Sequence, residues 1–144
     1  RKSRDVFMRY IYGLVGFSLF DTLIYILFPS APPWYAAQVG LLPPLQRIML
    51  VHDYFASKYV NLVSTYGNND FAAWPSHHAA WSFYASIFLI GVFGKKMLPS
   101  LIVPLVIVFA TWYGAEHYVI DSLAGFAIAG FTYWIVMRIG KKRG

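Results

Sequence analysis

Four apolar runs dominate the sequence, and their lengths leave few folds open to it. They cover about residues 6–28, 76–93, 98–113 and 117–139. As a helix, the first run of about 23 residues would be roughly 34 Å long, enough to cross a bilayer core. Hydrophobic residues make up 58% of the chain and charged residues 12%, a composition typical of membrane proteins. The sequence therefore predicts an all-α membrane protein, a single domain over residues 1–144 with a bundle of four transmembrane helices.

An amphipathic helix is predicted over residues 45–63, between the first two runs. At 100° per residue, one side of it is apolar and the other side is polar. Arg47 and Lys58 fall on the polar side, and His52 falls on the apolar side. Such a helix lies in the membrane interface, where it would cover the active site from outside. A lone histidine on an apolar face is more often a packed residue than a catalyst, and we expect this of His52.

Two features inside the apolar runs bear on helix packing. Asp21 lies in the first run, where an ionised carboxylate must face protein or water. It is interpreted either as a link to the hydrogen-bond network of an active site or as a polar residue that packs helices. In the last run, small residues let helices approach closely: Ala124, Gly125, Ala127, Ala129 and Gly130.

The basic residues predict the orientation in the membrane. With a cytoplasmic N-terminus, ten of the 12 Lys and Arg residues lie inside, and only Arg47 and Lys58 lie outside. We therefore expect a multi-pass integral membrane protein with both termini in the cytoplasm. The charges cluster at the ends of the apolar runs instead of along a groove with interleaved aromatic residues, which argues against a nucleic-acid partner.

Two polar clusters precede apolar runs, and both fall on the outer side in this topology. Pro75 and Ser76 suit the start of a helix, and the free N–H groups around Ser76 to His78 favour an anion. His117 and Asp121 are four residues apart, so on a helix they share a face, and the carboxylate can hold one imidazole nitrogen as N–H. An anion pocket, two histidines and an orienting carboxylate predict an extracytoplasmic phosphoryl-transfer site that needs no metal or cofactor.

At these residues the chain resembles the type 2 phosphatidic acid phosphatase superfamily. The family motif Pro-Ser-x-His matches residues 75–78, with His78 as the family histidine and His77 at the variable position. The motif His-x-x-x-Asp matches His117 to Asp121. Residues 28–34 (Phe-Pro-Ser-Ala-Pro-Pro-Trp) and 111–113 (Thr-Trp-Tyr) are similar to the aureobasidin A resistance protein group, which includes inositol phosphorylceramide synthase. The likeness covers about residues 21–125.

The resemblance implies a lipid phosphatase or phosphotransferase that works through a phosphohistidine. His117 would attack phosphorus, and Asp121 would keep His117 in the productive tautomer. His78 would protonate the leaving alcohol and then deprotonate the acceptor. Histidine titrates near neutrality, so the residue types themselves support these roles. Ser76 and His77 would contribute to binding of the phosphate.

The chain departs from the phosphatase pattern at the basic clamp that holds phosphate. Those enzymes carry a clamp upstream and a Ser-Arg pair before the second histidine, where this chain has Ala110-Thr111. Arg47 and Lys58 are the basic residues on the outer side, so they are the candidates to bind the substrate in its place. Contact with lipid headgroups would equally explain each of them. The family core normally has six spans, so the resemblance implies two further helices ahead of Arg1.

The predicted substrate is a membrane lipid of the phosphatidic acid, isoprenyl phosphate or phosphoinositide class. Water as the acceptor makes the enzyme a phosphatase, and a lipid alcohol makes it a headgroup transferase of the inositol-phosphate type. Three alternatives are not enzymes of this kind. His77, His78 and His117 could bind haem, or His78, His117 and Asp121 could bind zinc. The chain could also be a purely structural membrane protein. Both a monomer and a homo-oligomer are compatible with the sequence.

Overall fold

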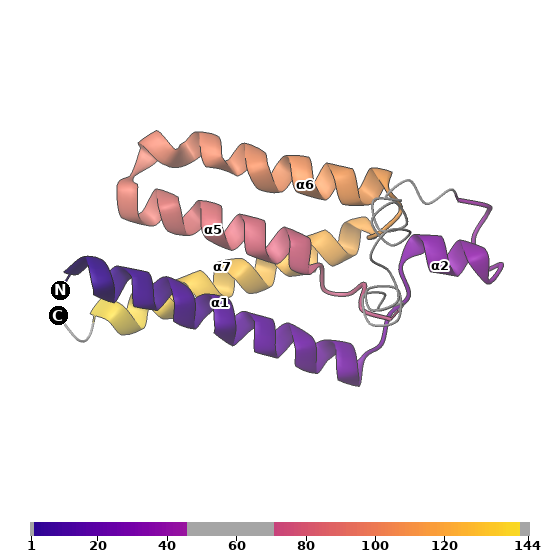
Figure 1. Ribbon diagram of the computed structural model, residues 1–144, viewed down its shortest axis with the longest axis horizontal. Coiled ribbons are helices and arrows are strands. Elements are labelled where there is room, and N and C mark those ends of the chain that lie inside the picture. The colour runs from indigo at the N-terminus through magenta and orange to yellow at the C-terminus, as the bar shows by residue number, and fades with distance from the viewer. Residues whose placement is uncertain (1, 46–70, 142–144) are drawn as a thin grey trace, which may run out of the picture.

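The computed structural model describes residues 2–45 and 71–141, and within these ranges the chain is helical (Figure 1). The helices are α1 (Lys2–Leu27), α2 (Pro33–Gln38), α5 (His77–Phe93), α6 (Ile102–Tyr113) and α7 (Val119–Lys141), with the 3-10 helix η1 (Lys95–Leu101) ahead of α6. The described residues contain no strand, only an isolated parallel bridge between Ser30 and Ala72.

Three of the described helices are long and apolar enough to cross a membrane. They are Arg4–Leu27, Lys95–Tyr113 and Val119–Ile139, which correspond to the first, third and fourth predicted spans. The second predicted span is α5, which has 17 residues. At about 1.5 Å per residue, α5 is roughly 26 Å long, slightly less than a bilayer core of about 30 Å. An all-α integral membrane protein is thus confirmed, whereas the count of four spans stays a prediction.

The helices form a bundle centred on α5. Helix α7 runs along α5 over most of its length, α1 packs across both, and α6 lies on the other side of α5 (Figure 1). Gly94 ends α5 with a φ of 82°, a conformation that glycine adopts without steric cost. Pro99 lies within the short η1 that follows and reverses the chain into α6.

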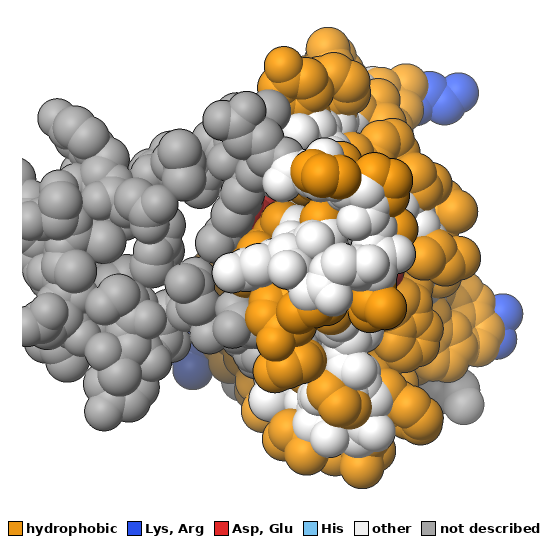
Figure 2. Space-filling view, turned by 90° about the vertical axis from the view of Figure 1, so that its right-hand side faces the viewer, with side chains coloured by type: hydrophobic (Ala, Val, Ile, Leu, Met, Phe, Trp, Pro, Cys, Tyr) orange, Lys and Arg blue, Asp and Glu red, His pale blue; other side chains and the backbone are white. Residues whose placement is uncertain are grey.

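Aromatic side chains fill the interior where the helices are farther apart, and small side chains lie where the helices approach closely. Tyr84 and Phe88 of α5 pack with Phe17 of α1, and the Phe17 and Tyr84 rings lie 5.3 Å apart. Ala80 and Ala129 complete this buried cluster at the contact of α5 with α7. Many large apolar side chains instead point outward, as lipid contact requires. Seen from the end that carries α2, the described surface is covered largely by hydrophobic side chains. The Lys and Arg side chains that are visible in this view lie at its edges (Figure 2).

The two ends of the bundle differ in what they carry. The start of α1 and the end of α7 lie at one end together with the turn between α5 and η1 (Figure 1). The starts of α5 and α7 lie at the opposite end, near α2 (Figure 1). Both predicted polar clusters therefore share one end of the bundle. Which side of the membrane that end faces stays a prediction.

Candidate active site

The first half of the site is the start of α5. Ser76 is the N-cap, because its Oγ accepts a hydrogen bond from the N–H of Ala79 at 3.3 Å. His77 and His78 are consequently the first residues of the helix. Successive helical side chains point about 100° apart, so the two imidazoles face different neighbours. His78 contacts the loop before α7, and His77 contacts α1.

The second half precedes and begins α7. The prediction that His117 is the first residue of this helix is wrong, because α7 begins at Val119. The reason is local: Oδ2 of Asp121 accepts a hydrogen bond from the N–H of Tyr118 at 2.7 Å, which satisfies a donor at the start of the helix. The N–H of His117 instead donates to the carbonyl of Thr111 at 3.3 Å, so the chain turns back at the end of α6.

Backbone contact joins the two halves. The N–H of Ser76 donates to the carbonyl of Asp121 at 2.9 Å. Gly125 follows one turn later on α7, and a Cβ placed there would come within 2.5 Å of the Ser76 carbonyl oxygen. Only glycine fits so close an approach of two backbones. The start of α5 is therefore held directly against α7.

His78, His117 and Asp121 lie together, and we call them the histidine cluster. Nδ1 of His78 lies 3.1 Å from Nε2 of His117. Nδ1 of His117 lies 2.9 Å from the carbonyl oxygen of Ala73 and 3.6 Å from Oδ2 of Asp121. His117 is 8% exposed and Asp121 is 2% exposed, whereas His78 is exposed. One buried imidazole thus lies behind an accessible one.

These contacts fix the tautomer of His117. A carbonyl oxygen can only accept a hydrogen bond, so Nδ1 of His117 carries the hydrogen and Nε2 keeps its lone pair. Oδ2 of Asp121 is farther away and already accepts from Tyr118. The Ala73 carbonyl therefore shares the orienting task that the sequence assigned to Asp121 alone. Because every residue has a carbonyl, no sequence pattern could have identified this one.

The link between α1 and α2 supports both loops of the site. Trp74 donates its N–H to Oγ of Ser30 at 2.7 Å, and Ala73 donates its N–H to the Ser30 carbonyl at 3.0 Å. The N–H of Trp34 donates to the carbonyl of Ala115 at 3.1 Å. The residue that orients His117 is therefore itself held in place. The sequence marked this link through its family resemblance only and gave no sign of these three hydrogen bonds, two of which are made by Ser30.

At the start of α5, fewer backbone N–H groups are free to bind an anion than the sequence predicted. The N–H of Ser76 is occupied by the Asp121 carbonyl, and the N–H of Ala79 is occupied by the Ser76 side chain. At most the N–H groups of His77 and His78 are left for a phosphate oxygen. The Ser76 side chain serves as a helix cap instead of facing a ligand.

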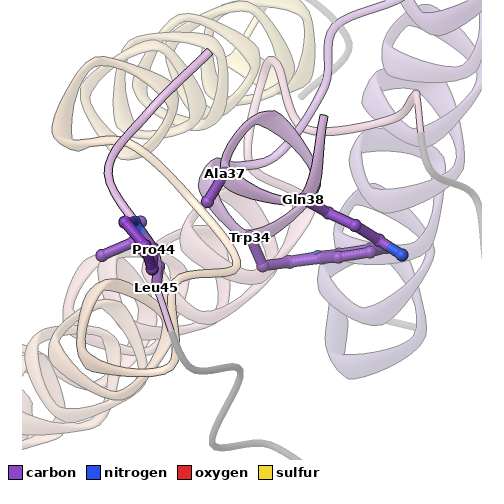
Figure 3. Close-up of a pocket in the computed structure, with 5 residues that line it drawn as sticks. All are labelled: Trp34, Ala37, Gln38, Pro44 and Leu45. Atoms are coloured by element: carbon purple, nitrogen blue, oxygen red, sulfur yellow. The ribbon is translucent and has the colours of Figure 1, made fainter. Parts of the chain in front are cut away.

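Arg47 and Lys58, the predicted replacements for the clamp, lie outside the described residues, as do His52 and residues 46–63 of the interfacial helix predicted over residues 45–63. A cavity of about 420 Å³ opens beside α2 and is lined by Trp34, Ala37, Gln38, Pro44 and Leu45 (Figure 3). No member of the histidine cluster lines this cavity. In the described part of the chain, no group of three or more His, Cys, Asp or Glu side chains is placed to hold a metal ion.

Comparisons with known proteins agree with the motifs. A phosphoinositol dihydroceramide synthase from Bacteroides thetaiotaomicron is 28% identical over 150 residues, which cover 97% of this chain and 48% of that protein. The catalytic subunit of inositol phosphorylceramide synthase from Schizosaccharomyces pombe is 29% identical over 119 residues, 78% of this chain and 28% of that protein. The chain thus spans about half the length of the first relative and less than a third of the second. No solved structure matches the chain.

A family model gives the broadest match. The model described as the PAP2 superfamily aligns with residues 1–135, which include both histidine motifs and the link between α1 and α2. The resemblance to the type 2 phosphatidic acid phosphatases is thereby confirmed, and both relatives named above come from its inositol phosphorylceramide synthase-like group. Because the match covers nearly all of the sequence, the chain belongs to the PAP2 superfamily.

Proposed function

We propose that the chain is a single membrane-embedded domain that transfers phosphoryl groups of membrane lipids through a phosphohistidine at His117. The observation that supports this most is the geometry of the histidine cluster. A buried imidazole whose Nδ1–H donates to a carbonyl directs the lone pair of its Nε2 at Nδ1 of a second, exposed imidazole 3.1 Å away. That arrangement pairs a nucleophile with an acid. Membership in the PAP2 superfamily supports the same class of reaction.

In the first step, the lipid phosphate displaces the 3.1 Å contact between Nδ1 of His78 and Nε2 of His117, and the two imidazoles move apart to admit it. Nε2 of His117 forms a bond to phosphorus while the bond from phosphorus to the ester oxygen breaks. His78 enters this step as the imidazolium and gives its Nδ1 proton to that oxygen, so the alcohol leaves neutral and His78 becomes a neutral imidazole. The positive charge that forms on His117 is stabilised by the carboxylate of Asp121 and by the Ala73 carbonyl.

In the second step, His78 acts as a base. It takes a proton from water or from an alcohol, whose oxygen attacks the phosphorus. The bond between nitrogen and phosphorus breaks, and His117 regains its lone pair. The exposed position of His78 suits this exchange with arriving molecules, while the burial of His117 limits direct contact of the intermediate with solvent. We place the reaction at the extracytoplasmic face, because the distribution of basic residues predicts cytoplasmic termini.

Two candidate activities differ in the molecule that accepts the phosphoryl group. Both named relatives are synthases that join an inositol-phosphate group to a ceramide-type lipid by name, which favours a lipid alcohol as the acceptor. The substrate would then be a phosphodiester of the phosphoinositide class. With water as the acceptor, the same site would be a phosphatase for phosphatidic acid or isoprenyl phosphates.

The test is product analysis with labelled lipids. Purified protein in micelles is given labelled phosphatidic acid or phosphatidylinositol, with and without added ceramide, and products are separated by thin-layer chromatography. A new labelled lipid that requires ceramide supports the transferase, and free headgroup phosphate supports the phosphatase. His117→Ala should lose turnover and acid-labile phosphoenzyme together. A His117→Ala protein that still binds labelled phosphate covalently would refute the assignment of the nucleophile.

A further inference from the structure

A buried carboxylate next to the histidine cluster has no role in the proposed chemistry. Asp21 of α1 is 0% exposed, and neither of its oxygens has an aligned hydrogen-bond donor among the described residues. Nε2 of His77 lies 3.2 Å from Oδ2 of Asp21, close enough for an ion pair although the two are not aligned as a hydrogen bond. An acidic residue at this depth in a membrane helix is costly, and such residues are typically retained for a function.

Two aromatic rings hold His77 at this place. The rings of Tyr25 and Trp81 lie 5.3 and 5.4 Å from the imidazole. Both are anchored: the hydroxyl of Tyr25 donates to the carbonyl of Pro75 at 2.5 Å, and Nε1 of Trp81 donates to Oγ of Ser18 at 3.1 Å. The imidazole therefore has little freedom to turn, and its Nε2 edge stays against α1.

The burial of Asp21 and His77 determines which atoms of the pair carry hydrogens, and therefore whether His77 can donate a hydrogen bond. A net charge on Asp21 and His77 would be costly here, so the neutral pair with two dissociable protons is favoured. One proton is carried either by the carboxylate or by Nε2, and the other lies on Nδ1. In both arrangements Nδ1–H is a hydrogen-bond donor. Nε2 is buried while the side chain as a whole is 27% exposed, so the exposed part of His77 is an edge other than Nε2.

We propose that Asp21 and His77 form a phosphate-binding pair, in which Asp21 positions His77 and Nδ1–H of His77 donates to a phosphate oxygen of the substrate. This inference rests on the proposed function, since the phosphate that reacts at the histidine cluster must also reach the exposed edge of His77, whose imidazole faces α1. Within residues 2–45 and 71–141, Lys and Arg occur on α1, η1 and α7 only, away from the starts of α5 and α7. The pair supplies a donor where this part of the chain offers no cation.

The test measures phosphate affinity in two ways on the purified full chain in detergent micelles. Steady-state kinetics with phosphatidic acid gives kcat and KM, and calorimetric titration with inorganic phosphate gives Kd without any turnover. We expect His77→Gln and Asp21→Leu each to raise KM and Kd together, by roughly ten- to hundredfold, the range for one hydrogen bond to a charged group. The value of kcat should change little.

Further variants separate positioning from a merely structural role. Asp21→Leu removes one partner of a buried pair and leaves Nε2 of His77 unpartnered, so it should lower the melting temperature as well as the phosphate affinity. Asp21→Asn should restore most of the affinity, because its amide can donate to Nε2 and leave the hydrogen on Nδ1. The double variant of Asp21→Leu and His77→Gln should bind no more weakly than the weaker single variant. Asp5→Asn, the same change near the opposite end of α1, should alter nothing.

Several results would refute the proposal that Asp21 and His77 form a phosphate-binding pair. One is an Asp21→Leu protein that binds phosphate like the parent, and another is a double variant whose loss equals the product of the single losses. A rise in KM without a rise in Kd would place the contact on another part of the lipid. If Asp21→Leu does not fold, Asp21→Ala takes its place with the same expectation. If the parent turns over no lipid phosphate, the proposed function fails, and the Kd values for inorganic phosphate still decide whether the pair binds phosphate.

Discussion

Replacing Gly125 by alanine should damage both the fold and the site, because this glycine sets the distance between α5 and α7. The added Cβ would lie 2.5 Å from the Ser76 carbonyl oxygen, where ordinary contact begins at 3.4 Å. Two backbones cannot give way as a flexible side chain does, so the helices must part by up to 0.9 Å, the difference between these values. Overpacking of this kind costs about 1–3 kcal/mol, and misplacing reacting groups by about 1 Å costs roughly a hundredfold in rate.

Gly130→Ala is the matched control, since it is the same change on the same helix with no atom within 4 Å of the new Cβ. Alanine favours helices over glycine by about 1 kcal/mol, so the control should gain stability, and this gain partly hides the loss at Gly125. The difference between the two variants isolates the packing cost. Unfolding in mixed micelles with increasing SDS measures stability, and turnover of phosphatidic acid measures activity. If Gly125→Ala is as stable and active as Gly130→Ala, the close contact does not position the site.

Three further predictions test the acid, the support of the site and the topology. His78→Ala should slow turnover by roughly 10²–10⁴-fold, yet still form phosphoenzyme from an aryl phosphate whose leaving group needs no proton; failure to form it would contradict the assigned role. Ser30→Ala leaves the N–H of Trp74 without its 2.7 Å acceptor and should cost about 1–3 kcal/mol in SDS unfolding, so unchanged stability would count against this support. Because the chain has no cysteine, Gln38→Cys should react with an impermeant thiol reagent outside intact cells and Lys96→Cys should not; the reverse labelling would contradict extracytoplasmic placement of the site.

The sequence predicts the helices well because bilayer-length apolar runs have few alternatives to the helix. Their ends are less predictable, because competing side chains decide them. Asp121 captures the N–H of Tyr118, so α7 starts after that residue and not at the preceding histidine. Similarly, the third run begins as the 3-10 helix around Pro99 and becomes α-helical only at Ile102.

The side chains of the site were predictable, but much of what positions them was not. The spacing of His117 and Asp121 is visible in the sequence, and so is the cap at Ser76. In contrast, the orienting group at Ala73 is a backbone carbonyl, and the partner of Asp21 depends on how α1 is rotated against α5. Contacts of both kinds follow from tertiary packing, which residue types alone do not specify.

The separation of the contacting segments along the chain has a consequence for biogenesis. Ala73 and His117 are 44 residues apart, and so are Ser30 and Trp74. At a synthesis rate of about 5–20 residues per second, roughly 2–9 s pass between the appearance of the Ala73 carbonyl and that of the imidazole it orients. In the mechanism proposed above, His78 has no nucleophile beside it during that interval. The proposed reaction then requires that α7 has been inserted against α5.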